Sequence, residues 1–352
     1  MARLRDHVIR AGLETLYFSG AHRFMRHLYE GVGAILTLHH VRPENDAAFH
    51  PNRILEITPE FLEAMIGEMR RMEIDLISLD EMAQRLKRGD TGRRFVCITF
   101  DDGYRDNKQF AYPILKAHKV PFAIYVPSSF ITRSGELWWL ALETLIASNN
   151  EISLDMDGAR RLFSLRSTEE KEDAFAEIYW WLRSQSSDLV IRNTMRVVCG
   201  RYGVDVRLFC DELCMTWSDL AELAADPLVT IGAHTVNHPF LAKMPIEKAR
   251  EEIENGAQAL MVRLGKRPQH FSFPFGDAES AGPREFALAA ELGFQTAVTT
   301  RPGVLFAEHR DHLTALPRIS INGDYQKLRY VDVLISGAAT AAWNGFKRVD
   351  AA

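Results

Sequence analysis

The chain has 352 residues, of which 47% are hydrophobic and 25% are charged, so it is long enough to bury a large core. Its length suits one barrel-sized domain with an insertion, or two domains. The formal net charge of −5 gives no reason to expect a nucleic acid as partner. The cysteines show no CxxC spacing, and free thiols in a reducing compartment are the simpler interpretation of Cys97, Cys199, Cys210 and Cys214.

Residues 1–32 are expected to form an N-terminal helical extension. The first thirty positions hold more Arg than acidic residues, with apolar residues between them. No apolar run is long enough for a signal peptide or a transmembrane helix, so a cytoplasmic location is the default expectation. In the alternative, residues 1–30 form a helix that lies on an anionic membrane surface and makes the protein membrane-peripheral, although such helices more often pack on their own domain.

Strand-like and helical segments then alternate in the manner of a β/α barrel. One helix is predicted after Thr58, which precedes Pro at the first helical position, and another runs from Pro245 to Gly265. Strands are predicted near residues 34–39, 95–100, 121–126, 229–233, 270–274, 295–299 and 317–321. The predicted domains are a barrel over 33–130 and 217–325, and a C-terminal helix and tail over 326–352.

Residues 131–216 read as helical and unlike the rest, which predicts an inserted helical lid or subdomain. Most of the Trp residues of the chain lie in or next to this segment. Because sugar rings stack on exposed aromatic faces, Trp138 and Trp139, which are nearest to the barrel in sequence, are candidates for a substrate-binding wall. The alternative is that these indole rings form the core of the insertion.

The predicted strand at 95–100 leads directly into two carboxylates, Asp101 and Asp102, followed by Gly103. Two ionised carboxylates there would repel each other, and each would be costly to desolvate without a cation or strong donors. A metal ion solves both problems if one carboxylate binds it and the other acts on its bound water. In the alternative, Asp102-Gly103 is a turn and Asp101 caps the next helix.

The predicted strand at 229–233 likewise leads into two His, His234 and His238. With Asp102 they make a set of two imidazoles and one carboxylate, which suits Zn²⁺ and leaves a coordination position open, as in catalytic sites. Two partly buried His with ordinary hydrogen bonds are the alternative. Gly232 and Pro239 argue against the helix on which an HExxH metalloprotease site would lie.

Residues 99–103, Thr-Phe-Asp-Asp-Gly, and residues 234–238, His-Thr-Val-Asn-His, together resemble the polysaccharide deacetylases of carbohydrate esterase family four, the NodB-like hydrolases. Residues 271–276 are similar to the family's aromatic-Pro-aromatic-Gly segment, which places Pro274 and Phe275 at the substrate groove. The resemblance implies an α/β fold, a distorted (β/α) barrel of about seven strands with a helical insertion, whose active site lies at the carboxyl ends of the strands.

The resemblance also implies roles for the matching residues. Asp102, His234 and His238 would bind one divalent metal ion, with Zn²⁺ expected and Co²⁺, Ni²⁺ or Mn²⁺ as alternatives. Asp101 would be the general base that takes a proton from water activated by the metal. A backbone N–H near Tyr104 would help to hold the oxyanion of the tetrahedral intermediate.

Two parts of the family pattern are missing. No Leu-x-His segment supplies a general acid, but residues 38–41, Leu-His-His-Val, resemble the Tyr-His-x-Val of one branch. His39 is therefore the candidate acid and His40 the second, unless either simply caps a strand end. The Arg that many members place before the Pro-aromatic segment is also missing, and Arg301 or Arg318 could replace it as the group that orients Asp101, or be a surface charge.

The expected activity is the hydrolytic removal of an acetyl group from an N-acetylated sugar of a polysaccharide, an oligosaccharide or a lipid-linked glycan precursor. Without a visible export signal, a biosynthetic precursor is favoured over a finished wall polymer. Two alternatives stay open. The chain could hydrolyse a C–N bond in an amide that is not a sugar, or it could be a glycan-binding module without catalysis.

Overall fold

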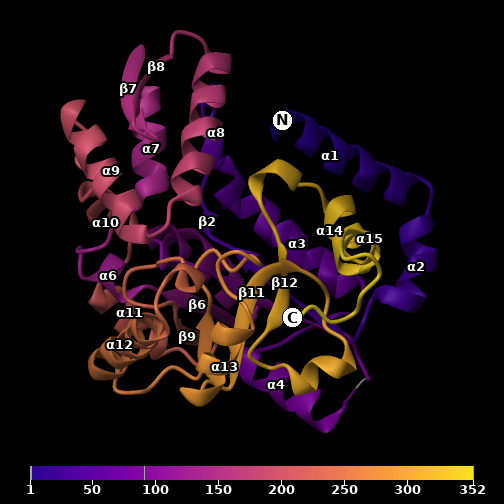
Figure 1. The fold of residues 1–352 in the computed structure, drawn as a ribbon. Coiled ribbons are helices and arrows are strands. Elements are labelled where there is room, and N and C mark those ends of the chain that lie inside the picture. The colour runs from indigo at the N-terminus through magenta and orange to yellow at the C-terminus, as the bar shows by residue number, and fades with distance from the viewer. Residues whose placement is uncertain (1, 91, 352) are drawn as a thin grey trace.

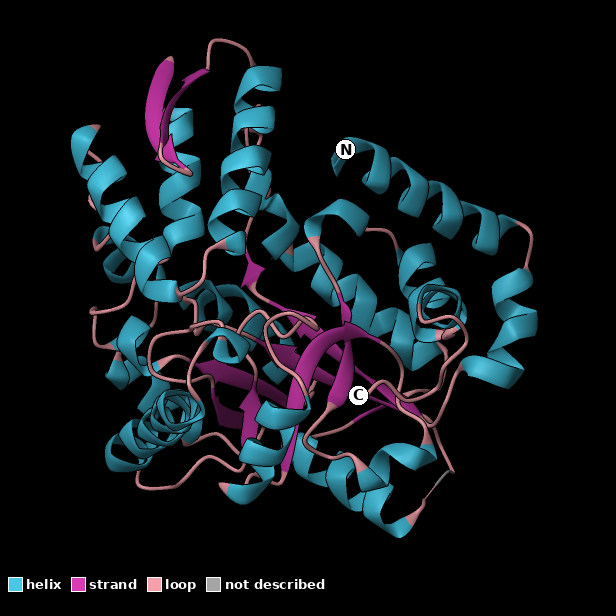
Figure 2. Cartoon of the chain, viewed as in Figure 1, coloured by secondary structure: helices cyan, strands magenta, loops and turns pink. Residues whose placement is uncertain are grey.

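Parallel strands form the centre of the molecule, and helices surround them (Figure 2). The computed structural model describes residues 2–90 and 92–351. Within them the closed sheet has the order β1 (Gly33–Leu38), β12 (Leu316–Ser320), β11 (Thr296–Pro302), β10 (His270–Ser272), β9 (Val229–Ala233), β6 (Phe122–Val126) and β5 (Phe95–Phe100), and β5 pairs back to β1. The short strand β4 (Asp75–Leu76) pairs with the first residues of β5. The predicted distorted (β/α) barrel is confirmed.

Helices follow the strands and cover the outside of the barrel (Figure 1). They are α3 (Pro59–Arg71), α4 (Leu79–Arg88), α5 (Tyr112–Ala117), α11 (Trp217–Ala224), α12 (Ile246–Leu264) and α13 (Pro283–Glu291). The helix α3 begins as its sequence predicts, because the Thr58 side chain accepts a hydrogen bond from the Phe61 N–H. The helix α12 ends at Gly265, whose φ of 75° would strain any other residue.

The register of the barrel brings the polar strand ends to one rim. Leu38 pairs with Phe100, so His39 and Asp101, the next residues, leave the sheet at the same level. Val126 pairs with Ala233, and His234 follows at the same rim. Just beyond β1, the short strands β2 (His40–Val41) and β3 (Glu56–Ile57) pair with each other. Residues far apart in sequence therefore meet at the carboxyl ends of the strands, where barrel active sites form.

Between β6 and β9 the chain forms an insertion that stands away from the barrel (Figure 1). Its helices are α6 (Ser128–Ile131), α7 (Trp138–Ala147), α8 (Thr168–Ser184), α9 (Asp188–Arg201) and α10 (Leu208–Leu213), and it also contains the hairpin of β7 (Glu151–Met156) and β8 (Ala159–Ser164). The predicted helical insertion therefore also contains one β-hairpin, which the sequence analysis did not predict. The two turn residues, Asp157 and Gly158, have φ values of 52° and 81°, as a two-residue hairpin turn requires.

The two ends of the chain pack together. The helices α1 (Ala2–Phe18) and α2 (Ala21–Tyr29) contact α14 (Leu328–Ile335) and α15 (Ala338–Trp343). Leu13 lies in a small apolar cluster with Tyr330 and Val333, and Glu14 accepts hydrogen bonds from Arg329 and Tyr330. Among the described helices, none combines the length and apolar character needed to cross a membrane.

Candidate metal centre and active site

The chain turns sharply where β5 ends. Asp102 has a φ of 72°, and three more non-glycine residues with positive φ, Thr235, His238 and Phe275, belong to the His and Pro-aromatic segments singled out in the sequence. Side chains with a Cβ atom rarely adopt this backbone conformation, and clusters of such residues are typical of functional sites. The backbone here is thus held in conformations that its residues do not prefer.

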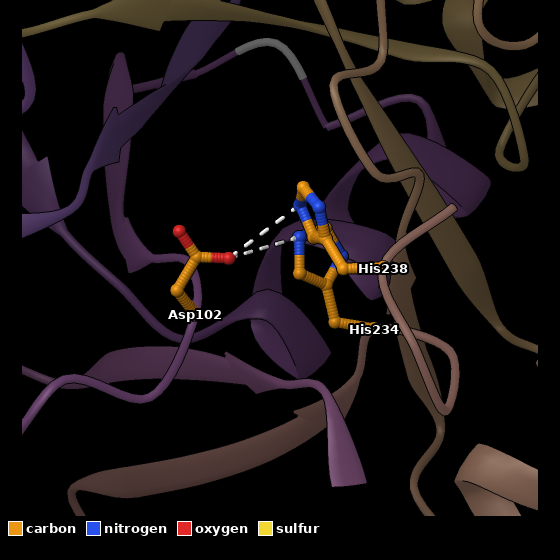
Figure 3. Close-up of side chains that lie close together, drawn as sticks. All are labelled: Asp102, His234 and His238. Atoms are coloured by element: carbon orange, nitrogen blue, oxygen red, sulfur yellow. Dashed lines mark ion pairs between the residues drawn. The ribbon is translucent and has the colours of Figure 1, made fainter. Parts of the chain in front are cut away.

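Asp102, His234 and His238 converge at this rim (Figure 3). The Asp102 Oδ1 atom is 3.7 Å from Nε2 of His234 and 3.5 Å from Nε2 of His238. The Nδ1 atom of His234 is 2.6 Å from the carbonyl oxygen of Ser272. Because a carbonyl can only accept, Nδ1 carries the proton and Nε2 turns its lone pair toward Asp102.

These three side chains fit a divalent metal ion. All are buried, and their ligand atoms lie within 4.8 Å of one another. Among the described residues, Oδ1 of Asp102 has no hydrogen-bond donor although it is buried. A tetrahedral ion with bonds of about 2.1 Å separates its ligand atoms by about 3.4 Å, close to the spacings here. The geometry therefore supports a divalent metal site formed by the predicted residues.

The ionisation of the three groups agrees with this interpretation. Burial lowers the pKa of His234 and that of His238, so both imidazoles are neutral at pH 7 and can act as ligands. Burial, helped by the charge of Asp101, raises the pKa of Asp102 to about 8. A cation reverses that shift, because it stabilises the ionised carboxylate directly.

Asp101 lies in a very different environment. Two Arg318 nitrogens donate to its carboxylate, with Nη1 at 2.8 Å from Oδ1 and Nη2 at 2.6 Å from Oδ2. Burial alone would raise the pKa of Asp101, but the charge and hydrogen bonds of Arg318 outweigh burial and hold it well below its usual range. Arg318 is itself fixed by the Thr299 carbonyl and the Thr99 hydroxyl.

Arg301, the other Arg considered for this position, binds a different set of residues. Its guanidinium donates to the Ala281 carbonyl and to Asp350, and it lies over the ring of Phe286. These contacts favour Arg318 over Arg301 as the residue that orients the Asp101 carboxylate.

The two candidate acids, His39 and His40, differ in their surroundings. Burial lowers the pKa of His39 to about 4, and the charges that act on this ring include Asp101 and His234, so it lies beside the site. His40 instead places Nδ1 at 2.6 Å from Asp106 Oδ2 and stacks on Tyr104 with ring centroids 3.6 Å apart. His40 is thus held by other partners, and the role of His39 as the acid stays a prediction.

A family model described as polysaccharide deacetylase matches residues 88–174 and 181–297, more than half of the chain. The chain belongs to the polysaccharide deacetylase family. This family consists of carbohydrate N-deacetylases, which are hydrolases, and the match includes Asp101, Asp102 and both His ligands. A search of curated proteins gives no match.

Solved structures of deacetylases share the fold. IcaB from Ammonifex degensii aligns with a TM-score of 0.54 at 16% identity, over 86% of this chain and 97% of its own. The Streptococcus pyogenes deacetylase PplD, in complex with acetate, aligns with a TM-score of 0.52 at 17% identity over 82% and 92%. A de-N-acetylase from Aggregatibacter actinomycetemcomitans gives 0.52 at 14% identity over 83% and 96%. At these identities the likeness shows the fold alone.

Aromatic residues from the barrel and the insertion surround His238. The ring of Phe275 lies 4.7 Å from that of His238 and stacks on Phe240 at 3.9 Å, and Trp139 lies 5.3 Å from His238. Trp138 and Trp139 are both buried, as are Tyr104 and Pro274. Neither indole presents an exposed face for a sugar ring in this structure, and their substrate role stays a prediction.

Sequence reasoning missed two residues that support the site. The Ser272 carbonyl accepts a hydrogen bond from the Nδ1–H of His234, and the Ser272 hydroxyl accepts one of 3.0 Å from Arg318. Asp106 holds His40. A signal for Ser272 was its place in the Pro-aromatic segment, whereas Asp106 lies in a helical stretch whose direction only the fold reveals.

Proposed function

We propose that this protein removes the acetyl group from an N-acetylated sugar of a polysaccharide, an oligosaccharide or a lipid-linked glycan precursor. The observation that carries the proposal is a buried set of metal ligands directly beside a carboxylate that Arg318 keeps ionised. A hydrolase that attacks an amide with water needs both a site for a cation and a separate proton acceptor. The donors Asp102, His234 and His238 favour Zn²⁺, with Co²⁺, Ni²⁺ or Mn²⁺ as alternatives.

In this proposal each side chain has one task. When bound, the cation would acidify water in the site and polarise the acyl carbonyl. Asp101 accepts the proton of the attacking water, and Arg318 holds the carboxylate in position. Because its pKa is low, Asp101 is a weak base and depends on an acidified water. The backbone N–H of Tyr104 donates to the developing oxyanion.

The proposed mechanism assigns proton delivery to His39. An amine leaves poorly unless its nitrogen gains a proton, and His39 lies close enough to Asp101 to sense its charge. Since burial lowers the pKa of His39 to about 4, the ring is neutral before the reaction. We therefore propose that the proton taken from water passes from Asp101 to His39 and then to the leaving nitrogen, so that acetate and a free amine are the products.

Acetate release from metal-loaded protein tests the proposal. The panel should contain N-acetylated oligosaccharides and lipid-linked N-acetyl sugars, with Asp101→Asn as the inactive control. We expect acetate and free amine in equal amounts from at least one of them. Saturable glycan binding without acetate release from the folded, metal-loaded protein would instead support a binding module. Turnover of non-sugar amides alone would support a different hydrolase.

A further inference from the structure

The helix α2 has a fixed orientation on the molecule. Its inner face binds Asp332 of α14, with His22 Nε2 at 3.2 Å from Oδ2 and Arg26 Nη2 at 2.5 Å from Oδ1. His22 is fully buried, and its Nδ1 lies 2.8 Å from the Leu16 carbonyl oxygen. Because these contacts prevent α2 from rotating about its axis, the residues on its outer face are held toward solvent.

That outer face exposes large apolar side chains. Phe24 is 76% exposed and Leu28, one helical turn later, is 54% exposed. Phe346, which is 56% exposed, lies at the end of α2, where its ring is 5.7 Å from that of Tyr29. The terminal patch, defined as Phe24, Leu28 and Phe346, thus joins residues from both ends of the chain, where α2 and α15 contact each other (Figure 1).

Basic residues flank the terminal patch. Arg23 and His27 share the exposed face of α2, and Lys347 and Arg348 follow Phe346 in the chain. Arg348 Nη2 lies 3.4 Å from the Leu28 carbonyl oxygen, which places this basic pair beside α2. Within the part of the chain that the structure describes, Arg23, His27 and Lys347 form no ion pair with a carboxylate, and Arg348 has only Glu308 at 3.7 Å.

We propose that the terminal patch docks on the surface of an anionic phospholipid bilayer. Aromatic and aliphatic side chains next to cations such as Arg23 and Lys347 are what such a surface binds, because the apolar groups enter the headgroup boundary while the cations meet phosphates. Binding is peripheral and weakens as salt screens the cations. The inference goes beyond the hydrolytic function and does not depend on it.

Vesicle flotation of the full-length protein tests this docking. The probes are vesicles of phosphatidylcholine alone and of phosphatidylcholine mixed with phosphatidylglycerol. We expect binding to the anionic vesicles only, lost at high salt. The double variant Phe24→Ser/Leu28→Ser should bind at least about tenfold more weakly, a loss of about 1.4 kcal/mol. Unchanged melting and metal content would show that the variant folds.

A matched control tests whether vesicle binding depends on the terminal patch or on any exposed apolar residues. Leu162 and Leu189 in the insertion are 66% and 63% exposed, and Leu162→Ser/Leu189→Ser should bind vesicles like the wild type. No binding of the wild type to either vesicle, or equal losses in both double variants, would overturn the proposal. It would also be overturned if the wild type formed a dimer that Phe24→Ser/Leu28→Ser dissociates and bound no vesicles, because the patch would then join two copies of the chain.

Discussion

The two halves of the site treat adjacent carboxylates in opposite ways. Asp101 receives two hydrogen bonds from Arg318 and stays ionised, so this half is complete within the protein. Asp102 faces two neutral imidazoles, has a buried oxygen without a donor, and has a pKa raised to about 8. One half fixes a charge, and the other half fits a cation. Residues distant in sequence thus prepare the two neighbouring carboxylates of one motif for different chemistry.

The largest effect is expected from His238→Ala, which removes a ligand from the half that needs a cation. After equal exposure to Zn²⁺, the wild type should hold about one ion per chain. The variant should hold none and release acetate only at the background rate. His270→Ala is the matched control, because this buried His contacts Thr296 and Asp80 rather than the ligand set. Equal metal content in the wild type and His238→Ala would contradict the site.

Asp101→Asn should separate the two halves. The amide cannot accept a proton as the carboxylate does, so we expect kcat to fall by about 10²–10⁴-fold while the metal content is unchanged. The isosteric change at the next residue, Asp102→Asn, should lose the metal as well. Metal analysis beside acetate release checks both. If Asp101→Asn also lost the ion, the division of roles between the carboxylates would be wrong.

The metal half was predictable from sequence, and its supporting half was not. Asp102 and His234 come within two residues of the ends of predicted strands, so the parallel topology brings them to one rim, and His238 follows in the same loop as His234. To decide whether Arg301 or Arg318 orients Asp101, one must know the direction in which each side chain points. Strand alternation gives that direction only in a regular strand, and the pairing of β11 with β12 shifts register between Val298 and Pro302.

The structure of the insertion was also only partly predictable from its sequence. The Asp157-Gly158 pair is a strong local signal for a hairpin, and the alternation of Ile152, Leu154 and Met156 before it is typical of a strand. The helical character of the longer segment 131–216 outweighs these few residues when the segment is judged as a whole. The burial of Trp138 and Trp139 has no local signal, since it depends on how α7 packs against Tyr179 and Phe275. Likewise, nothing in residues 38–41 tells which His turns toward Asp101.

Arg318→Met should lower the stability of the fold and not only the rate of acetate release, because the substitution leaves the buried Asp101 charge without its partner. Breaking a buried ion pair on one side costs about 3–5 kcal/mol. The double variant Asp101→Asn/Arg318→Met removes both charges and should recover much of that stability, although not activity. Urea unfolding of the three proteins measures this. A double variant less stable than Arg318→Met would show that the Asp101 carboxylate stabilises the barrel through contacts other than Arg318, such as the Ser272 hydroxyl.

The ion pair of Asp101 and Arg318 should make the stability of the fold depend on pH, with lower stability in acid. The folded pKa of Asp101 lies below its unfolded value of about 3.9. The pair therefore contributes its full stability above about pH 4, and this contribution is lost as the pH falls toward the folded pKa. The difference in the free energy of unfolding between the wild type and the double variant should be smaller at acidic pH than at neutral pH. If the difference were the same at both pH values, Asp101 would not be the carboxylate whose protonation lowers the stability.

The smallest effect is expected from Ser272→Ala, at the residue that joins the two halves. Its backbone carbonyl orients His234, whereas its hydroxyl accepts from Arg318, so the substitution removes only the contact with the Asp101 half. A single hydrogen bond is worth about 0.5–1.5 kcal/mol, which predicts a loss of about 2- to 10-fold in kcat. Zn²⁺ affinity should not change, since the carbonyl stays in place. Titration of the ion into wild type and variant checks this, and weaker Zn²⁺ binding by the variant would mean that the two halves are coupled through Ser272 rather than independent.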